Sequence, residues 1–433
     1  MRRFLTRIFL DIPGDAINWG VQRHSLVFVL GALTVTGVLA GMTGHWLFWR
    51  GSYLIAGLVV VCFLWARNNA KGLDVEVERT IDRLQVGQET ETRLHLKSTS
   101  MFTKVYLEIE DETTMPGGGA RTVITLPAKS TRNWKVRGAC RRRGLYSSGP
   151  LKVTTGDPFG LFRFSQTFGE KHNILVLPQP EELPYFWAPA AQLPGEGVVH
   201  QRTHYVTPNA SGIREYHPGD SYNRIHWKST ARLGRMMVKT FEMDPTSNIW
   251  LVLDLHGDSQ GGSGDESTEE YGVRIAASLA FRFAESNRML GLMMDGREKV
   301  LMEPARGSQQ YGRILEALAV ASATGKTSLA ALLQEEGRRL SRQTTVLIIT
   351  PCLDDEWIAS LSLVLQQGAR AAVILLDAGS FGKEDAGDPP TDALNAANVI
   401  TYLVRSQSDI SLMLGPSGVV GDSAPERQKA GAR

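Results

Sequence analysis

The sequence predicts a multidomain protein in which a transmembrane helical hairpin precedes an antiparallel β-sandwich and an α/β domain with a doubly wound parallel sheet. Three observations lead to this prediction. Two long uncharged runs lie near the start, a period-two pattern of apolar residues follows them, and strand and helix patterns alternate in the last part of the chain. With 433 residues, 42% of them hydrophobic, the chain is long enough to bury more than one core.

The two uncharged runs, Ser25–Met42 and Ser52–Ala66, predict a two-helix transmembrane hairpin over residues 25–68. The second run is slightly short for a bilayer unless the connector before it is partly inserted. Trp46 and Trp49 lie in that connector, where tryptophans are expected at a membrane interface. The connector is therefore the predicted tip of the hairpin.

The distribution of basic residues predicts the orientation of the hairpin. Residues 1–24 form an arginine-rich N-terminal segment, and Arg67 and Lys71 follow the second run. The positive-inside rule therefore predicts a two-pass protein of the inner (cytoplasmic) membrane with both termini in the cytoplasm. A cleaved signal peptide and a buried soluble hairpin are the alternatives. The long N-terminal region, the immediate second run and the flanking arginines disfavour them.

Residues 72–180 alternate apolar and polar residues between turn residues, which predicts a small antiparallel β-sandwich. It is immunoglobulin-like in outline but lacks the Cys–Trp–Cys pattern of true immunoglobulin domains. The region also contains a basic cluster, which predicts either a solvated strand face or contact with anionic lipid headgroups. The basic residues are Arg132, Lys135, Arg137, Arg141, Arg142 and Arg143.

The remainder of the chain divides by composition into four segments. A proline-rich linker is predicted over residues 181–210, a highly charged segment over 211–248, the α/β domain over 249–410 and a disordered tail over 411–433. The α/β domain begins with the continuous apolar run Ile249–Leu255, which is typical of a buried parallel strand. Its first helix is predicted over residues 269–286, because apolar residues there recur on one face.

Net charge and cysteine content exclude several classes of function. The formal net charge is only +2, which argues against a dedicated nucleic-acid-binding protein. Cys62, Cys140 and Cys352 are scattered and odd in number, so they predict neither a disulfide framework nor a zinc site. A reducing, cytoplasm-facing environment is the simplest interpretation.

The charged segment, Ser211–Asp244, combines six basic and four acidic residues with two histidines and a tryptophan. Structural ion pairs and a surface that docks a protein partner are the two main interpretations, because so many charges cannot be buried unpaired. A catalytic site and single-strand nucleic-acid binding are weaker alternatives, since no oxyanion donor can be named and acidic residues are interspersed. The candidate partner-binding residues are Arg214, Tyr216, Asp220, Arg224, Trp227, Lys228, Arg232 and Lys239.

The motifs of this segment resemble those of the bacterial "domain of unknown function 58" family. The resemblance rests on Arg214-Glu215-Tyr216-x-Pro218-Gly219-Asp220, Arg224-Ile225-x-Trp227-Lys228, Thr230-Ala231-Arg232 and Val238-Lys239-x-Phe241-Glu242, with Arg142-Arg143-Gly144-x-Tyr146, Gly149-Pro150 and Asp157-Pro158-Phe159-Gly160 upstream. It implies a membrane-anchored protein with a von Willebrand factor A-like C-terminal domain. It also implies MoxR-type AAA+ ATPases and transglutaminase-like membrane proteins as partners. It implies no particular reaction.

A metal site is the main chemical alternative. In von Willebrand A-like domains the first strand ends in Asp-x-Ser-x-Ser and holds a divalent cation, whereas this chain has Asp254, His256 and Asp258 at the corresponding positions. Both serines are absent, and Thr350 stands where a later strand usually supplies an aspartate. We therefore predict a non-enzymatic adaptor without a cofactor, which contacts membrane lipid and a protein partner but no nucleic acid. A metal-assisted hydrolase that uses Asp254 and Asp258 is the alternative.

Overall fold

The computed structural model divides the chain into two compact units, Met1–Pro178 and Gln179–Arg433, which are described separately. The described residues are 18–21, 23–79, 83–116, 119, 121–186, 210–216, 222, 225–241, 248–340, 344–384 and 387–420.

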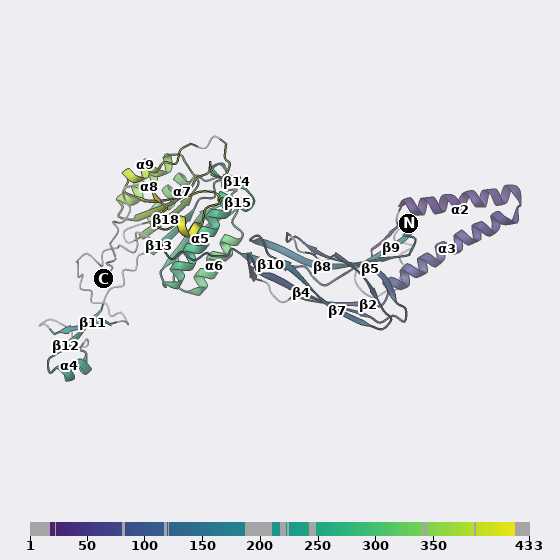
Figure 1. Cartoon of the computed structure of the whole chain (residues 1–433), viewed down its shortest axis with the longest axis horizontal. Helices are drawn as coiled ribbons and strands as arrows, with labels where there is room; N and C mark the ends of the chain where they lie inside the picture. Colours follow the sequence, from purple (N-terminus) through teal and green to yellow (C-terminus); the bar gives the residue numbers. More distant parts are fainter. Residues whose placement is uncertain are drawn as a thin grey trace. The chain divides into compact units, whose positions relative to one another are not determined.

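Two antiparallel helices form a hairpin at the beginning of the first unit (Figure 1). Helix α2 spans Arg23–Thr43 and helix α3 spans Trp46–Ala70. The side chain of His45 caps α3 by accepting a hydrogen bond of 3.3 Å from the Leu47 N–H. With 25 residues, α3 is long and apolar enough to cross a membrane, and it is longer at both ends than the predicted run. The described apolar part of α2, Val27–Thr43, is shorter.

The rest of the first unit consists of two sheets. One sheet has the order β2-β4-β7, and the other contains β1-β9-β8-β10-β3 with β5 and β6 attached to β8 through β5. All strand pairs are antiparallel except β10 with β3. The strands are β1 (Asn18–Val21), β2 (Leu73–Arg79), β3 (Arg83–Gln85), β4 (Glu89–Ser98), β5 (Lys104–Thr113), β6 (Arg121–Leu126), β7 (Thr131–Ala139), β8 (Gly144–Gly156), β9 (Phe162–Phe168) and β10 (His172–Leu177).

The two sheets share one hydrophobic core. Leu94 and Leu96 on β4 point inward because side chains of a strand alternate between its two faces. They pack in the same cluster as Leu107 on β5 and Leu151 on β8, which belong to the other sheet. Strand β1 lies in residues for which only an N-terminal segment was predicted, and it pairs with β9.

The second unit contains a mixed sheet in the order β17-β16-β13-β18-β19-β20-β21. The five central strands are parallel, and the edge strands β17 and β21 are antiparallel to their neighbours. The prediction of a wholly parallel sheet is therefore corrected at both edges: three residues connect β16 to β17, and the connection from β20 to β21 contains α10. The strands are β13 (Asn248–Leu253), β16 (Leu290–Asp295), β17 (Lys299–Ala305), β18 (Thr344–Thr350), β19 (Arg370–Leu376), β20 (Ile400–Val404) and β21 (Val419–Val420).

Helices cover both faces of this sheet. Trp250 and Val252 on β13 pack in one cluster with Trp357 on α8, whereas Leu253 faces Gly272 on α5. Because successive side chains of a strand point to opposite faces, Trp250 and Val252 lie on one face of the sheet and Leu253 lies on the other. The helices are α5 (Thr268–Glu285), α6 (Ser308–Ala319), α7 (Leu329–Glu336), α8 (Glu356–Gln366), α9 (Thr391–Ala396) and α10 (Ile410–Met413).

Two predicted boundaries of the second unit need correction. Leu183 and Phe186, in the predicted linker, are buried; their carbonyls accept hydrogen bonds from Arg282 on α5, and the Phe186 ring packs against Phe283. The predicted tail begins later than residue 411. Helix α10 is capped by the Asp409 side chain, and β21 pairs with β20, so regular structure continues to residue 420. Residues 421–433 lie outside the described part of the chain.

Candidate functional site

Within the charged segment, a helix lies between two paired strands in the order of the chain (Figure 1). Strand β11 (Ala210–Glu215) pairs antiparallel with β12 (Met237–Phe241), and helix α4 spans Trp227–Leu233. The register joins Glu215 to Met237, and the Arg235 guanidinium lies 3.3 Å from the Glu215 carboxylate. Both of these charged side chains are more than half exposed, so the pair contributes little to stability.

Local hydrogen bonds define both ends of α4. The His226 ring accepts a hydrogen bond of 3.2 Å from the Ser229 N–H at the start of the helix. Gly234 ends the helix in the left-handed conformation, with φ of 67°, and its N–H donates to the Thr230 carbonyl. The Met237 N–H donates to the Thr230 hydroxyl at 3.0 Å, which ties the helix to β12. We did not predict this helix, although Gly234 directly after Leu233 is a sequence signal for a helix end.

Most side chains of α4 are exposed, and only Ser229 and Thr230 are half-buried. The helix contains no buried residue, and Trp227 is 68% exposed. Lys228 and Arg232 are also exposed, and their spacing of four residues places them on the same face. Tryptophan and arginine are residue types that often anchor protein–protein binding. We call Trp227, Lys228 and Arg232 the α4 surface.

The other predicted binding residues have different outcomes. Tyr216 follows β11 and is half-buried, and its ring stacks on that of Tyr222 with 5.8 Å between centroids. Arg214 and Lys239 lie in β11 and β12, where the register pairs them with Val238 and Ile213. Asp220 and Arg224 lie outside the residues that the structure describes.

The second predicted site lies at the carboxyl end of β13. Asp254 is buried, and both of its carboxylate oxygens accept hydrogen bonds: Oδ2 from the Thr350 hydroxyl at 2.7 Å, and Oδ1 from the His256 N–H at 3.0 Å. Burial raises the pKa of Asp254, although these two hydrogen bonds oppose the shift. The adjacent strands β13 and β18 bring Asp254 and Thr350 together across 96 positions of sequence.

His256 and Asp258 do not complete a coordination sphere with Asp254. The Asp258 side chain is 98% exposed, and its carboxylate lies 4.0 Å from the His256 ring. Among the described residues, no group of three or more His, Cys, Asp or Glu side chains is arranged to hold a metal ion. The geometry therefore fits a hydrogen-bonded strand end. The Thr350 hydroxyl donates to the Asp254 oxygen that a bound cation would otherwise contact.

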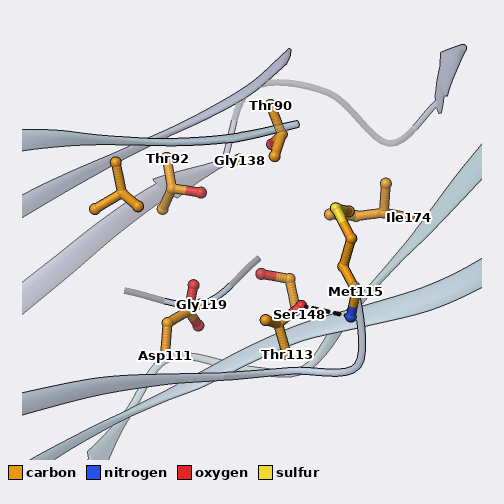
Figure 2. A pocket seen from close by; sticks show the side chains of 10 residues that line it. Thr90, Thr92, Asp111, Thr113, Met115, Gly119, Gly138, Ser148 and Ile174 are labelled. Atoms are coloured by element: carbon orange, nitrogen blue, oxygen red, sulfur yellow. Dashed lines mark hydrogen bonds between the residues drawn. The ribbon is translucent and has the colours of Figure 1, made fainter. Parts of the chain in front are cut away.

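The first unit contains a small cavity between its two sheets, which Figure 2 shows from close by. Its volume is about 20 Å³, enough for a single water molecule. Asp111 lines the cavity and forms an ion pair of 3.0 Å with Arg79, whose side chain is also buried. The cavity is thus part of a polar core and is too small for an organic ligand.

A different group of polar residues, which we did not predict, connects α3 to the sheets. Asn69 and Lys104 are buried and form hydrogen bonds across this junction. Within the sequence, the only signal for them was the position of Asn69 directly after an uncharged run and of Lys104 within an apolar strand pattern.

Comparisons with known proteins agree with the sequence motifs. The "Uncharacterized protein YeaD" of Bacillus subtilis is 24% identical over 410 residues, which cover 92% of this chain and 97% of that protein. The "Uncharacterized protein Rv1480" of Mycobacterium tuberculosis is 25% identical over 202 residues, which cover 45% of this chain and 64% of that protein.

Among solved structures, the CARDB domain of the PF1109 protein from Pyrococcus furiosus is 14% identical, with coverage of 25% of this chain and 94% of that chain and a TM-score of 0.19. Proximal thread matrix protein 1 from the mussel byssus is 10% identical, with coverage of 40% and 47% and a TM-score of 0.29. Scores this low do not establish a shared fold. The family model that matches is "Protein of unknown function DUF58", and it matches residues 212–380, from β11 to the turn after β19.

Proposed function

We propose that this chain is a membrane-anchored, non-enzymatic adaptor that binds a protein partner through the α4 surface. The observation that carries this proposal is the exposure of α4. None of its residues is buried, and it presents a 68% exposed tryptophan on one side and two exposed cations on another. Tryptophan and arginine are the residue types that contribute most often to protein–protein binding energy.

The chemistry of the α4 surface favours a partner with an acidic rim around an apolar pocket. Lys228 and Arg232 would face the acidic groups, and the Trp227 ring would enter the pocket. The sequence motifs of this segment support a MoxR-type AAA+ ATPase as the partner, with a transglutaminase-like membrane protein as a second member of the assembly. The role of the complex would be an assembly or chaperone pathway at the membrane.

We further propose that α2 and α3 cross the inner membrane as a two-pass hairpin with both termini in the cytoplasm. Strand β1 precedes α2 and pairs with β9, and Ala66 and Ala70 at the end of α3 pack in one cluster with Phe162 and Phe164 of β9. Both ends of the hairpin therefore meet the same sheet, which favours an even number of crossings. A reporter fused after Leu414 should give a cytoplasmic signal, and a periplasmic signal would reverse the proposed orientation.

The finer fold assignments are part of the same proposal. The two packed sheets of the first unit would be an immunoglobulin-like β-sandwich, and the second unit would be a von Willebrand A-like domain. In support, each unit has the layer arrangement that these folds require: two facing sheets in the first and helices on both faces of a central sheet in the second.

The partner proposal is tested by a pull-down of the purified MoxR-type ATPase with the full-length protein in nanodiscs. We expect Trp227→Ala and Arg232→Glu each to lower capture several-fold. Matched controls are Leu363→Ala, which truncates a 55% exposed side chain on α8, and Arg338→Glu, which reverses an exposed charge after α7. Equal capture by all four variants and by the unsubstituted chain would refute the role of the α4 surface.

A further inference from the structure

The tryptophans of α3 mark the positions at which a membrane would begin and end. Trp46 and Trp65 are both exposed, and they are separated by 19 positions. At 1.5 Å per residue this corresponds to about 29 Å, close to the thickness of the hydrocarbon layer. Tryptophans favour the interfaces of the bilayer, so Trp65 lies at the boundary on the side of the sheets.

The turn between β8 and β9 contacts α3 below this boundary. Leu161 and Phe162 pack in one cluster with Cys62, and Phe162 meets Phe63 edge to face with 5.5 Å between ring centroids. Further along the helix, Leu58, Phe159 and Leu161 line an open groove of about 440 Å³. The other residues of this groove are Ser25, Phe28 and Val29 on α2. Leu58 is seven positions from Trp65, about 10 Å along α3, and Ser25 lies near the start of α2, so the groove would extend from the boundary to about 10 Å inside it.

A shallower membrane position that leaves this turn in water does not fit the length of α3. In that arrangement only Trp46–Leu58 would remain in the hydrocarbon, and these 13 residues measure about 20 Å. Such a segment is too short to cross the layer, and the hairpin turn at Gly44 prevents the helix from extending further on the other side.

Hydrogen bonds within the turn satisfy several of its backbone donors. The Asp157 side chain accepts hydrogen bonds from the N–H groups of Phe159 and Phe162 at 2.9 and 2.6 Å. The Asp157 N–H donates to the Phe162 carbonyl, the Gly160 N–H donates to the Asp157 carbonyl, and Pro158 has no N–H. These donors are thus satisfied within the turn, as they must be away from water.

The outward surface of the turn is apolar. Residues 158–162 read Pro-Phe-Gly-Leu-Phe and contain no charge, and Phe159 is 64% exposed at the tip. The carboxylate of Asp157, the one charged group of the turn, is buried. An exposed phenylalanine beside an apolar groove has no polar partner to bind, whereas lipid acyl chains would cover both.

We propose that the β8–β9 turn, residues 157–161, inserts into the hydrocarbon layer of the membrane beside α3, with Phe159 at its tip and acyl chains in the groove between the turn and the two helices. This inference rests on the proposed membrane anchoring. It adds a second, non-helical membrane contact, which would fix the rotation and tilt of the first unit relative to the bilayer.

The experiment measures depth with a nitroxide label on single-cysteine variants of the full-length protein in nanodiscs, in a background with Cys62, Cys140 and Cys352 replaced by alanine. Labels are placed at Phe159, at Val60 on α3 and at Leu145, which is 60% exposed at the opposite end of β8. Continuous-wave EPR then compares the accessibility of each label to oxygen and to a water-soluble nickel chelate. A photoreactive benzoylphenylalanine at position 159 provides a second measurement that preserves the aromatic ring.

We expect the ratio of oxygen to nickel accessibility at Phe159 to resemble that at Val60 and to exceed that at Leu145 several-fold, and we expect the photoreactive residue to form lipid adducts. A label at Val60 that is exposed to nickel would refute the membrane anchoring itself. A lipid-exposed Val60 with a water-exposed Phe159 and no lipid adducts would refute the insertion of the turn alone.

Discussion

Asn69 of α3 and Thr155 of β8 are joined by a hydrogen bond of 2.6 Å from the amide nitrogen Nδ2 to the hydroxyl oxygen, across 86 positions of sequence. The same nitrogen donates to the Val105 carbonyl at 2.6 Å, and Oδ1 accepts from the Val105 N–H at 3.1 Å. The last turn of α3 is thereby attached to both β5 and β8. Because Asn69 is buried, water cannot replace these bonds when the side chain is changed.

We expect Asn69→Leu to loosen this junction. The substitution leaves both backbone groups of Val105 without their side-chain partner, which should lower the free energy of unfolding of the first unit by about 2–4 kcal/mol. Hydrogen exchange of peptides that contain Val105, measured on the full chain in nanodiscs, should become faster. Asn68→Leu is the matched control, because the Asn68 side chain is exposed. Equal exchange in the two variants would contradict this account.

Lys104 should make the stability of the first unit depend on alkaline pH. It is fully buried, and its ammonium donates to the backbone carbonyls of Asn68, in the last turn of α3, and of Lys71, directly after the helix. Burial lowers the pKa of Lys104 to about 8. Between pH 8 and its ordinary pKa of 10.5 the unfolded chain therefore binds more protons than the folded chain, so stability rises with pH by at most about 3 kcal/mol.

Replacement of Lys104 by methionine should remove this dependence and leave the two carbonyls without a donor. We expect Lys104→Met to be less stable than the unsubstituted chain by about 1–3 kcal/mol near neutral pH, and the difference should increase as pH rises above 8. Guanidinium unfolding at several pH values between 7 and 10.5 measures it. Parallel pH profiles for the two proteins would show that Lys104 keeps its ordinary pKa.

Asp254 should produce a pH dependence in the acidic range. Burial raises the pKa of Asp254 above its ordinary value of 3.8, so above that value the folded chain binds more protons than the unfolded chain. The stability that the neutral acid contributes is therefore present at low pH and is lost as pH rises through the folded pKa. Asp254→Asn, which cannot ionise, should gain stability relative to the unsubstituted chain as pH is raised to neutrality.

Thr350 supplies the matching test, because its hydroxyl donates to the ionised form of Asp254. Thr350→Val should cost about 1–3 kcal/mol at neutral pH and less in acid. The control is Thr345→Val on the same strand, since Thr345 is also buried but its hydroxyl has no hydrogen-bond partner among the described residues. The same cost for both substitutions would show that the Asp254 contact contributes nothing specific. The hydrolase alternative makes a different prediction, a rise in melting temperature with millimolar Mg²⁺. If the Asp254 oxygens are already occupied by hydrogen bonds, Mg²⁺ should leave the melting temperature unchanged.

Local patterns were sufficient for much of the fold. The period-two runs that place Leu94 and Leu96 inward, and the continuous run Ile249–Leu253, match buried strands. The helix predicted at 269–286 is α5, Thr268–Glu285. The edge strand β17 was not predicted, because an edge strand of mixed burial carries a weaker alternation than a core strand.

The sequence by itself determined the presence of apolar segments, much of the alternation of strands and helices, and the motifs of residues 211–248 that resemble a known family. These features depend on residues that are near neighbours in the chain. Only the tertiary structure decided that Thr350 satisfies Asp254, that Asn69 meets Thr155 and that Phe159 and Leu58 line one groove. Each of these contacts depends on which strands and helices become neighbours, and no local period in the sequence contains that information.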